Sequence, residues 1–313
     1  MYKHRMLEIY QKTLGNEFSF EGIGLHNGEN SKVTVKPSDA NSGIVFKRVD
    51  IEKNNIIEAD FKYVDSARLC TTLKNSHGIK IATVEHLMAA FYFTGVDNAI
   101  VEINNSEIPI MDGSAKDFVN LINKVGLKDL KEKRVYLKIL KPLELLEGEK
   151  RISIEPTNLG MEVDFKLEYK NKLIGNQRNL VKFYEEDMTN IYSSRTFCLF
   201  EDIEKIKSFG LAKGGSLDNA LVVKGNSVLN KNGLRNPKEF VNHKILDLAG
   251  DFLLSKYRIL GKVKCIQGGH YLSNVFIKKL IQNDNCFVKS TLNSVKIIKK
   301  DYESPAQKLA VSA

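Results

Sequence analysis

Residues 239–255 read EFVNHKILDLAGDFLLS, and this stretch carries the clearest structural pattern in the chain. Its apolar residues recur at helical spacing, at Val241, Ile245, Leu248, Phe252 and Leu253. A period of three to four residues predicts a buried amphipathic helix over 239–255.

The polar residues of this predicted helix also share a face. Residues four apart in a helix lie one above the other, so His243 and Asp247 point the same way and Asp251 stands one turn further along. An imidazole and a carboxylate arranged like this make half of a zinc site. An isolated H-x-x-x-D is more often an ordinary polar pair on a solvated face, so the rest of the chain has to decide between the two interpretations.

Length and composition favour a globular protein of two domains. The chain has 313 residues, of which 42% are hydrophobic, and this exceeds a typical domain of about 150 residues. The formal net charge of +9 suits an anionic substrate, a nucleic acid or a membrane surface. The sequence contains no basic-aromatic nucleic-acid module, so we expect no nucleic-acid partner.

Several features point to a soluble, cytoplasmic protein. The longest apolar run, residues 87–93, is far shorter than the roughly 20 residues that span a bilayer, so we expect no stable membrane insertion. The N-terminal residues lack the apolar segment of a signal peptide. Four widely separated cysteines, Cys70, Cys198, Cys265 and Cys286, are typical of free thiols in a reducing compartment.

The first half of the chain is predicted to combine short strands with two helices. Residues 18–22, 32–35, 44–49 and 96–103 favour strands, and His26 lies in a glycine-rich turn without an assigned role. A helix is predicted after Thr83 as its N-cap, with Glu85 in the first turn, where the helix dipole favours an acidic residue. The spacing around Glu85-His86 excludes both the H-E-x-x-H and the H-x-x-E-H protease signatures. A second helix, 115–124, is expected to be capped by Ser114.

The charged segment 126–134 is the predicted domain boundary, giving domains 1–130 and 131–298 and a flexible tail, 299–313. The second half is predicted to contain strands at 135–140, 143–146, 151–154, 161–169, 220–223 and 262–266, and helices at 202–209, 239–255 and 272–282. A Gly-Gly-His turn, 268–270, precedes the last helix.

Seven motifs in a fixed order resemble one family. They are T-V-E-H-L-M (83–88), E-I-P-I-M-D-G-S (107–114), S-R-T-F (194–197), G-G-S (214–216), G-L-R (233–235), H-K-I-L-D-x-x-G-D (243–251) and G-G-H-x-L (268–272). Together they are similar to UDP-3-O-acyl-N-acetylglucosamine deacetylases, the zinc amidases that commit Gram-negative bacteria to lipid A synthesis. The resemblance covers residues 17–280 and implies an α+β fold of two domains with similar topology, each a sheet layered with helices, with the active site between them.

The resemblance also implies the metal site. His86 from the first domain would join His243 and Asp247 from the second, leaving a fourth position open. The resemblance implies Zn²⁺, and Fe²⁺ would also suit these ligands.

The catalytic roles follow from the same resemblance. Glu85 would act as general base on the attacking water, and Thr196 would donate a hydrogen bond to the oxyanion. His270, oriented by Asp251, would protonate the departing amine. Without the other motifs, the ordinary interpretations would be a helix-terminal charge for Glu85, an exposed turn for His270 and a polar stripe for Asp251.

Substrate contacts are implied for three further residues. Lys244 would bind the UDP-linked acylated aminosugar, Phe197 would pack on the sugar, and Cys70 would lie near the site without a catalytic role. Their ordinary interpretations are a solvated helix residue for Lys244 and core packing for Phe197 and Cys70. An insertion, 171–179, is expected to form the apolar passage for the acyl chain, and we expect a monomer.

Three other classes of protein remain as alternatives. A different zinc hydrolase could use the same ligands, although both protease signatures are absent. A nucleic-acid-binding protein would account for the net charge, but it would leave the His, Asp and Glu residues without a role. A zinc-stabilised structural protein would need a fourth protein ligand, usually cysteine.

Overall fold

A computed structural model describes residues 7–157 and 159–292. It contains mixed sheets and helices, which confirms the predicted α+β class. The predicted tail, 299–313, lies outside the described residues. Within them, no helix combines the length and the apolar character needed to cross a bilayer.

The first half of the chain builds a five-stranded sheet. Its order is β2 (Phe18–Ile23), β3 (Asn30–Pro37), β9 (Ala99–Ile103), β4 (Ile44–Arg48) and β5 (Ile56–Glu58). Only the β9–β4 pair is parallel. Along β3 every second side chain is buried, as a sheet with one face on the core requires.

The second half builds a sheet of the same design. Around the later part of β19 (Arg258–Ile266), the order is β12 (Leu143–Glu147), β13 (Lys150–Pro156), β19, β14 (Met161–Glu168) and β15 (Asn176–Lys182). Only the β19–β14 pair is parallel among these. Earlier in β19, β11 (Val135–Ile139) pairs with it in parallel, and β20 (Phe287–Thr291) pairs with β11. Strand order and directions therefore repeat between the two halves of the chain.

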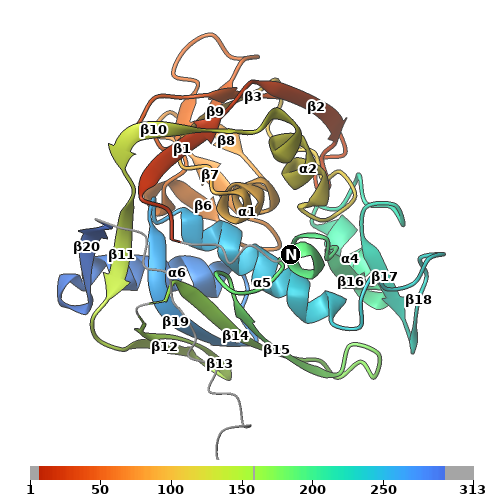
Figure 1. Ribbon diagram of the computed structural model, residues 1–313. Coiled ribbons are helices and arrows are strands. Elements are labelled where there is room, and N and C mark those ends of the chain that lie inside the picture. The colour runs from red at the N-terminus through yellow and green to blue at the C-terminus, as the bar shows by residue number, and fades with distance from the viewer. Residues whose placement is uncertain (1–6, 158, 293–313) are drawn as a thin grey trace, which may run out of the picture.

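The main helices repeat in the same way. In each half one helix precedes the central strand and another follows it: α1 (Glu85–Thr94) and α2 (Lys116–Val125) around β9, α5 (Glu239–Leu253) and α6 (His270–Gln282) around β19. Figure 1 shows these helices between the two sheets, with α1 above α5. Nearly all of α1 and α5 is buried, because each covers its own sheet and packs on the other helix.

Shorter elements surround this four-layered core. They are β1 (Tyr10–Leu14), η1 (Phe61–Tyr63), β6 (Val64–Ser66), β7 (Thr72–Lys74), β8 (Lys80–Ile81), β10 (Leu127–Lys133), α3 (Thr189–Tyr192), β16 (Phe197–Leu199), η2 (Phe200–Asp202), α4 (Ile203–Ser208), β17 (Leu221–Lys224), β18 (Ser227–Val228) and η3 (Asp284–Cys286). The charged boundary segment is mostly strand β10, which pairs antiparallel with β1.

Three local predictions need correction. Thr83 is not the N-cap of α1: its φ is 58°, and its hydroxyl donates to Glu107 instead of to the helix. Ala115, not Ser114, is the N-cap of α2, although the Ser114 hydroxyl accepts from the amide of Lys116. His270 begins α6 instead of ending a turn before it. For Thr83, the tertiary hydrogen bond to Glu107 outweighs the local capping preference.

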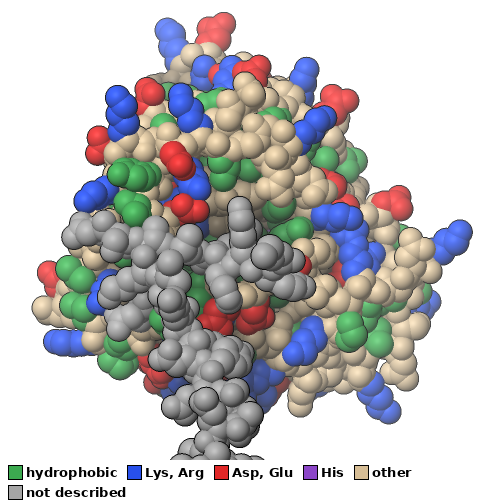
Figure 2. All heavy atoms as spheres, viewed as in Figure 1, with side chains coloured by type: hydrophobic (Ala, Val, Ile, Leu, Met, Phe, Trp, Pro, Cys, Tyr) green, Lys and Arg blue, Asp and Glu red, His purple; other side chains and the backbone are tan. Residues whose placement is uncertain are grey.

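The surface carries both signs of charge. Figure 2 shows lysine and arginine side chains interspersed with aspartate and glutamate over the visible face. Such a mixture of both signs of charge is typical of an ordinary solvated surface.

Candidate active site

A cavity of about 890 Å³ is lined by residues from both halves of the chain. The N-terminal end of α1, the middle of α5 and the first turn of α6 meet at its wall, because the two helical layers face each other there. Glu85, His86, His243, Asp247 and His270 all line it. The fold therefore brings residues from distant parts of the chain, such as Glu85 and His270, into one cavity.

Three of these residues form a potential metal site. His86, His243 and Asp247 offer ligand atoms within 4.8 Å of one another, and all three side chains are buried. Asp247 Oδ1 lies 3.6 Å from His86 Nε2 and 3.3 Å from His243 Nε2. This oxygen is buried without a hydrogen-bond partner among the described residues. A buried carboxylate oxygen facing two imidazole nitrogens fits a divalent cation such as zinc.

The protonation states suit metal binding. Burial lowers the pKa of His243 to about 3, against the opposing charge of Asp247, so the ring is neutral at physiological pH. Its Nδ1 lies 3.1 Å from the carbonyl oxygen of Ser194, which can only accept, so Nδ1 carries the hydrogen and Nε2 keeps its lone pair. Burial would raise the pKa of Asp247, but His243, Lys244 and His270 hold it well below its usual value.

Glu85 lies beside this cluster at the start of α1. Its side chain is 3% exposed, and burial raises its pKa, with His270 and His86 opposing that effect and Asp251 adding to it. Glu85 Oε2 accepts a hydrogen bond from the Thr71 amide at 3.0 Å. The Thr71 hydroxyl donates to Asp251 at 2.7 Å, so Thr71 connects the two carboxylates. Thr71 carries no sequence signal, since a lone threonine before a short strand belongs to no pattern.

His270 faces Glu85 from the first turn of α6. Its Nδ1 lies 2.9 Å from Asp251 Oδ2, and its Nε2 lies 3.7 Å from Glu85 Oε1 and 3.8 Å from Asp247 Oδ2. Burial alone would lower the pKa of His270, but these carboxylates, led by Asp251, raise it to about 10. Protonated His270 is the form that can donate a proton within this site.

The predicted oxyanion donor, Thr196, and the predicted substrate residues occupy different places. Thr196, Phe197 and Lys244 line the cavity. Lys244 Nζ lies 3.0 Å from Asp247 Oδ2 and 5.7 Å from the centre of the Phe197 ring. Cys70 is buried and does not line the cavity; burial and Glu85 raise the pKa of its thiol to about 12.

A second, mainly apolar cavity of about 360 Å³ adjoins the first. Both are lined by Leu25, His26, Leu69, Thr196 and Phe197. The rest of its wall comes from Cys198, η2, α4 and residues between 212 and 229. None of residues 171–179 lines this cavity; they mainly form the β14–β15 connection and the start of β15, and the passage expected there stays a prediction.

His26, which received no role from the sequence, lies at the junction of the two cavities. Its backbone amide donates to Glu107 at 2.9 Å, and its Nδ1 accepts from the Ala212 amide at 3.4 Å. Glu107 also accepts from the Thr83 hydroxyl at 2.8 Å, just before Glu85. Residues of the loops around both cavities, including Leu69, Thr83 and Ala212, have positive φ, a strained backbone that is common at functional sites.

Two imidazoles and a carboxylate beside a buried glutamate and a histidine–aspartate pair, set on this α+β fold, define a metal-dependent hydrolase. The family model described as UDP-3-O-acyl N-acetylglycosamine deacetylase matches residues 11–282. The chain belongs to this family, which confirms the resemblance inferred from the motifs.

Individual relatives agree with the family match. Proteins named UDP-3-O-acyl-N-acetylglucosamine deacetylase are similar to this chain over most of both lengths. The one from Geotalea uraniireducens (strain Rf4) is 42% identical, covering 89% of this chain and 90% of the relative. The one from Psychrobacter sp. (strain PRwf-1) is 38% identical, covering 94% and 99%. The one from Haemophilus ducreyi is 35% identical, covering 94% and 97%.

Proposed function

We propose that this protein hydrolyses the N-acetyl group of a UDP-3-O-acyl-N-acetylglucosamine and releases acetate, a step of lipid A biosynthesis. The observation that carries the proposal is the buried cluster of His86, His243 and Asp247, set beside Glu85 and His270 in one cavity. Family membership over residues 11–282 supports the substrate class.

The metal is zinc in this proposal, held by His86, His243 and Asp247. A zinc ion with an open position lowers the pKa of bound water towards about 7 and polarises an amide carbonyl. The neutral ring of His243 and the ionised carboxyl of Asp247 are the states that such an ion requires. Fe²⁺ could use the same ligands.

Each of the surrounding side chains carries out a different step in this proposal. Glu85 takes a proton from the attacking water, Thr196 donates its hydroxyl hydrogen to the oxyanion, and protonated His270 gives its proton to the departing amine. The raised pKa of His270 supports its role as an acid, and Asp251 fixes its ring through Nδ1. Lys244 and Phe197 bind the UDP-sugar, and the buried Cys70 takes no part in the chemistry.

The apolar cavity takes the acyl chain in this proposal. Its position next to Thr196 and Phe197 would let an acyl chain extend away from the reacting amide between η2, α4 and β17. The four cysteines are free, which suits a reducing cytoplasm. We propose that the enzyme acts there as a monomer on this UDP-linked substrate.

Acetate release from acylated and unacylated UDP-N-acetylglucosamine tests the proposal. We expect strong preference for the acylated compound, because binding energy from the chain positions the amide. Replacing Ala220, which lines the apolar cavity, by phenylalanine should raise KM for the acylated compound and leave slow turnover of the unacylated one unchanged. Equal rates on the two compounds with the wild-type enzyme would contradict the proposal.

A further inference from the structure

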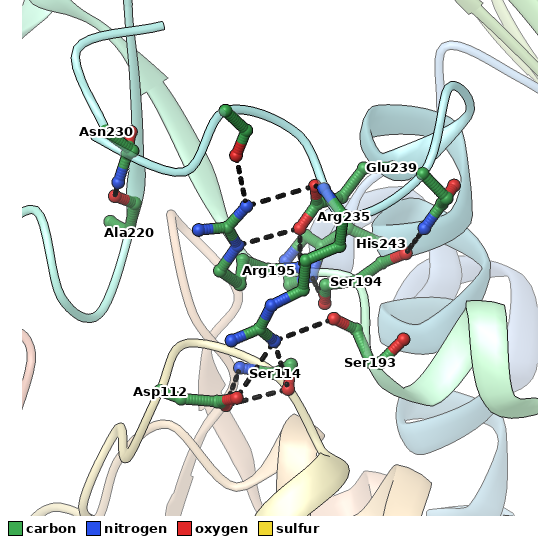
Figure 3. Close-up of polar contacts among 12 residues, drawn as sticks. Asp112, Ser114, Ser193, Ser194, Arg195, Ala220, Asn230, Arg235, Glu239 and His243 are labelled. Atoms are coloured by element: carbon green, nitrogen blue, oxygen red, sulfur yellow. Dashed lines mark hydrogen bonds and ion pairs between the residues drawn. The ribbon is translucent and has the colours of Figure 1, made fainter.

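One buried carboxylate, Glu239, holds the S-R-T-F segment in place. Glu239 is fully buried in the first turn of α5, four residues before His243. Its Oε1 accepts from the Arg195 side-chain Nε at 2.8 Å and from the Arg195 amide at 3.2 Å. Its Oε2 accepts from Arg195 Nη2 at 3.2 Å and from the Arg235 amide. Figure 3 shows these contacts beside His243.

The residue before Arg195 contacts a proposed metal ligand. The carbonyl oxygen of Ser194 accepts the Nδ1 hydrogen of His243, which leaves Nε2 of that ring free to face Asp247. The orientation of Ser194 depends on Arg195, since the two share a peptide group. A hydrogen bond of this kind sets both the tautomer and the direction of a metal-binding imidazole.

The residue after Arg195 is the proposed oxyanion donor, Thr196. Its amide donates to the carbonyl of Gly113 at 2.8 Å, and its carbonyl accepts from the amide of Leu221 at 2.8 Å. Arg235 ties the same region to the first half of the chain, because it reaches Asp112 at 2.9 Å and the Ser193 carbonyl at 2.9 Å. Figure 3 shows Arg235 between the turn at 112–114 and Ser193.

We propose that the Arg195–Glu239 pair is a positioning pair for the hydrolysis, acting through the residues on either side of Arg195. It aligns the Ser194 carbonyl with His243 and the Thr196 hydroxyl with the reacting amide. The inference rests on the proposed function, and it assigns the pair no contact with the substrate.

The geometry favours positioning over simple stabilisation. A buried ion pair is a weak source of stability, since apolar residues of similar size often serve as well. The Arg195–Glu239 pair has a role that apolar residues could not fill, because Glu239 also accepts hydrogen bonds from two backbone amides. The hydrogen bonds of Glu239 therefore determine the path of the main chain from Ser194, which contacts His243, to the proposed oxyanion donor Thr196.

The test uses full-length Glu239→Gln and the double variant Arg195→Met/Glu239→Leu, which removes both charges so that neither remains buried alone. Zinc affinity is measured by competition with a fluorescent chelator. The constants kcat and KM are measured with the acylated substrate. We expect zinc affinity and kcat to fall by roughly 10–100-fold, the usual effect of losing an outer partner of a metal ligand. KM should stay within about threefold, because substrate contacts are intact.

The Arg134–Asp97 pair provides a control away from the site, with the difference that Asp97 also pairs with Arg258 at 3.3 Å. It is also largely buried, its Asp97 also accepts a backbone amide, from Lys12, and neither residue lines the active-site cavity. Arg134→Met/Asp97→Leu should lower the melting temperature while zinc affinity and kcat stay near wild type. A second readout is non-additivity: in a Thr196→Ala background, Glu239→Gln should reduce kcat by a smaller factor than in the wild type.

Two results would overturn the inference. One is a folded Arg195→Met/Glu239→Leu variant with wild-type zinc affinity and kcat. The other is an equal loss of zinc affinity and kcat in the Arg134–Asp97 control, which would make both pairs purely structural. If the wild-type enzyme released no acetate, the proposed function would fail, while the zinc measurements would still test the positioning of His243.

Discussion

At the scale of single residues, burial and charge act in opposite ways on the two proposed proton carriers. Glu85 is buried, and burial raises its pKa above that of an ordinary glutamate. His270 is buried too, but Asp251, Glu85 and Asp247 outweigh burial and raise its pKa to about 10. One cavity therefore contains a carboxylate made more basic and an imidazole kept protonated, a combination suited to general base and general acid.

Replacing Glu85 by alanine should leave zinc binding intact and lower turnover by about 10²–10⁴-fold, the usual contribution of a positioned base. The physical reason is that Glu85 lies outside the three-ligand cluster but beside His270. Zinc content and kcat measured on one preparation give the result. Near-normal turnover with a small loss of stability would instead identify Glu85 as a helix-terminal charge.

The pH dependence of kcat should reveal the role of His270. Because its pKa is raised, the protonated ring persists above the ordinary histidine pKa and is lost as the pH rises towards about 10, so activity should fall on the alkaline side. Asp251→Asn removes the strongest charge that raises this pKa, so the alkaline limb should move to lower pH.

The variant His270→Gln should retain its affinity for zinc and substrate. It should lower kcat and flatten the alkaline limb of the pH profile. Profiles of kcat against pH for wild type and both variants provide the measurement. A normal His270→Gln enzyme with its alkaline limb unchanged would require a different general acid.

At the scale of elements, the crossing of α1 and α5 sets the geometry of the site. Glu85 and His86 begin α1, and His243 and Asp247 lie on α5. The helices approach so closely that a Cβ on Gly250 would overlap the carbonyl oxygen of Glu85. Gly250 is therefore required by close contact between two backbones, since its own φ is not positive.

Gly250→Ala should shift α1 against α5, because the overlapping atom belongs to the backbone and cannot rotate away. We expect a destabilisation of about 1–3 kcal/mol, the usual cost of overpacking, together with weaker zinc binding. Thermal unfolding and chelator competition measure the two effects. Gly22→Ala serves as the control, since its new methyl would meet Pro109 Cβ at 3.3 Å and should leave zinc affinity unchanged.

At the scale of the whole molecule, the proposed zinc ligands come from both halves of the chain. His86 precedes the segment 126–134, and His243 and Asp247 follow it. An ion held by these three ligands would connect α1 to α5 and stabilise their contact. This coupling links metal binding to the stability of the whole fold.

Zinc should accordingly raise the melting temperature. When free zinc is 100 times its dissociation constant, the free energy of unfolding should increase by about 2.7 kcal/mol. His86→Ala and His243→Ala should abolish both the shift and the bound metal, because each removes one of three ligands. Elemental analysis and thermal unfolding with and without a chelator test this. One metal ion per chain, unchanged in both variants, would show that the ion binds elsewhere.

The periodic parts of the fold could be predicted from the sequence because their pattern is local. Helix α5 was predicted over 239–255 and runs over Glu239–Leu253, and the main strands lie where alternating or β-branched runs indicated them. The faces of a helix follow from its period alone, so His243, Asp247 and Asp251 could be placed together without a structure. Motif order then led to the family, which the comparisons confirm.

Tertiary structure decided everything that depends on contact between distant segments. Thr83 resembled a helix cap, but its hydroxyl donates a hydrogen bond to Glu107. The apolar cavity lies beside η2, α4 and β17, a position that no sequence pattern indicated. Thr71 and Glu239 gave no sequence signal, because a single threonine or glutamate gains its meaning only from the partner that folding brings to it. The period of a helix or strand can be read directly from the order of the residues. The pKa of His270 and the course of the chain around Arg195 depend instead on charges and hydrogen bonds that form only after α1, α5 and α6 have packed.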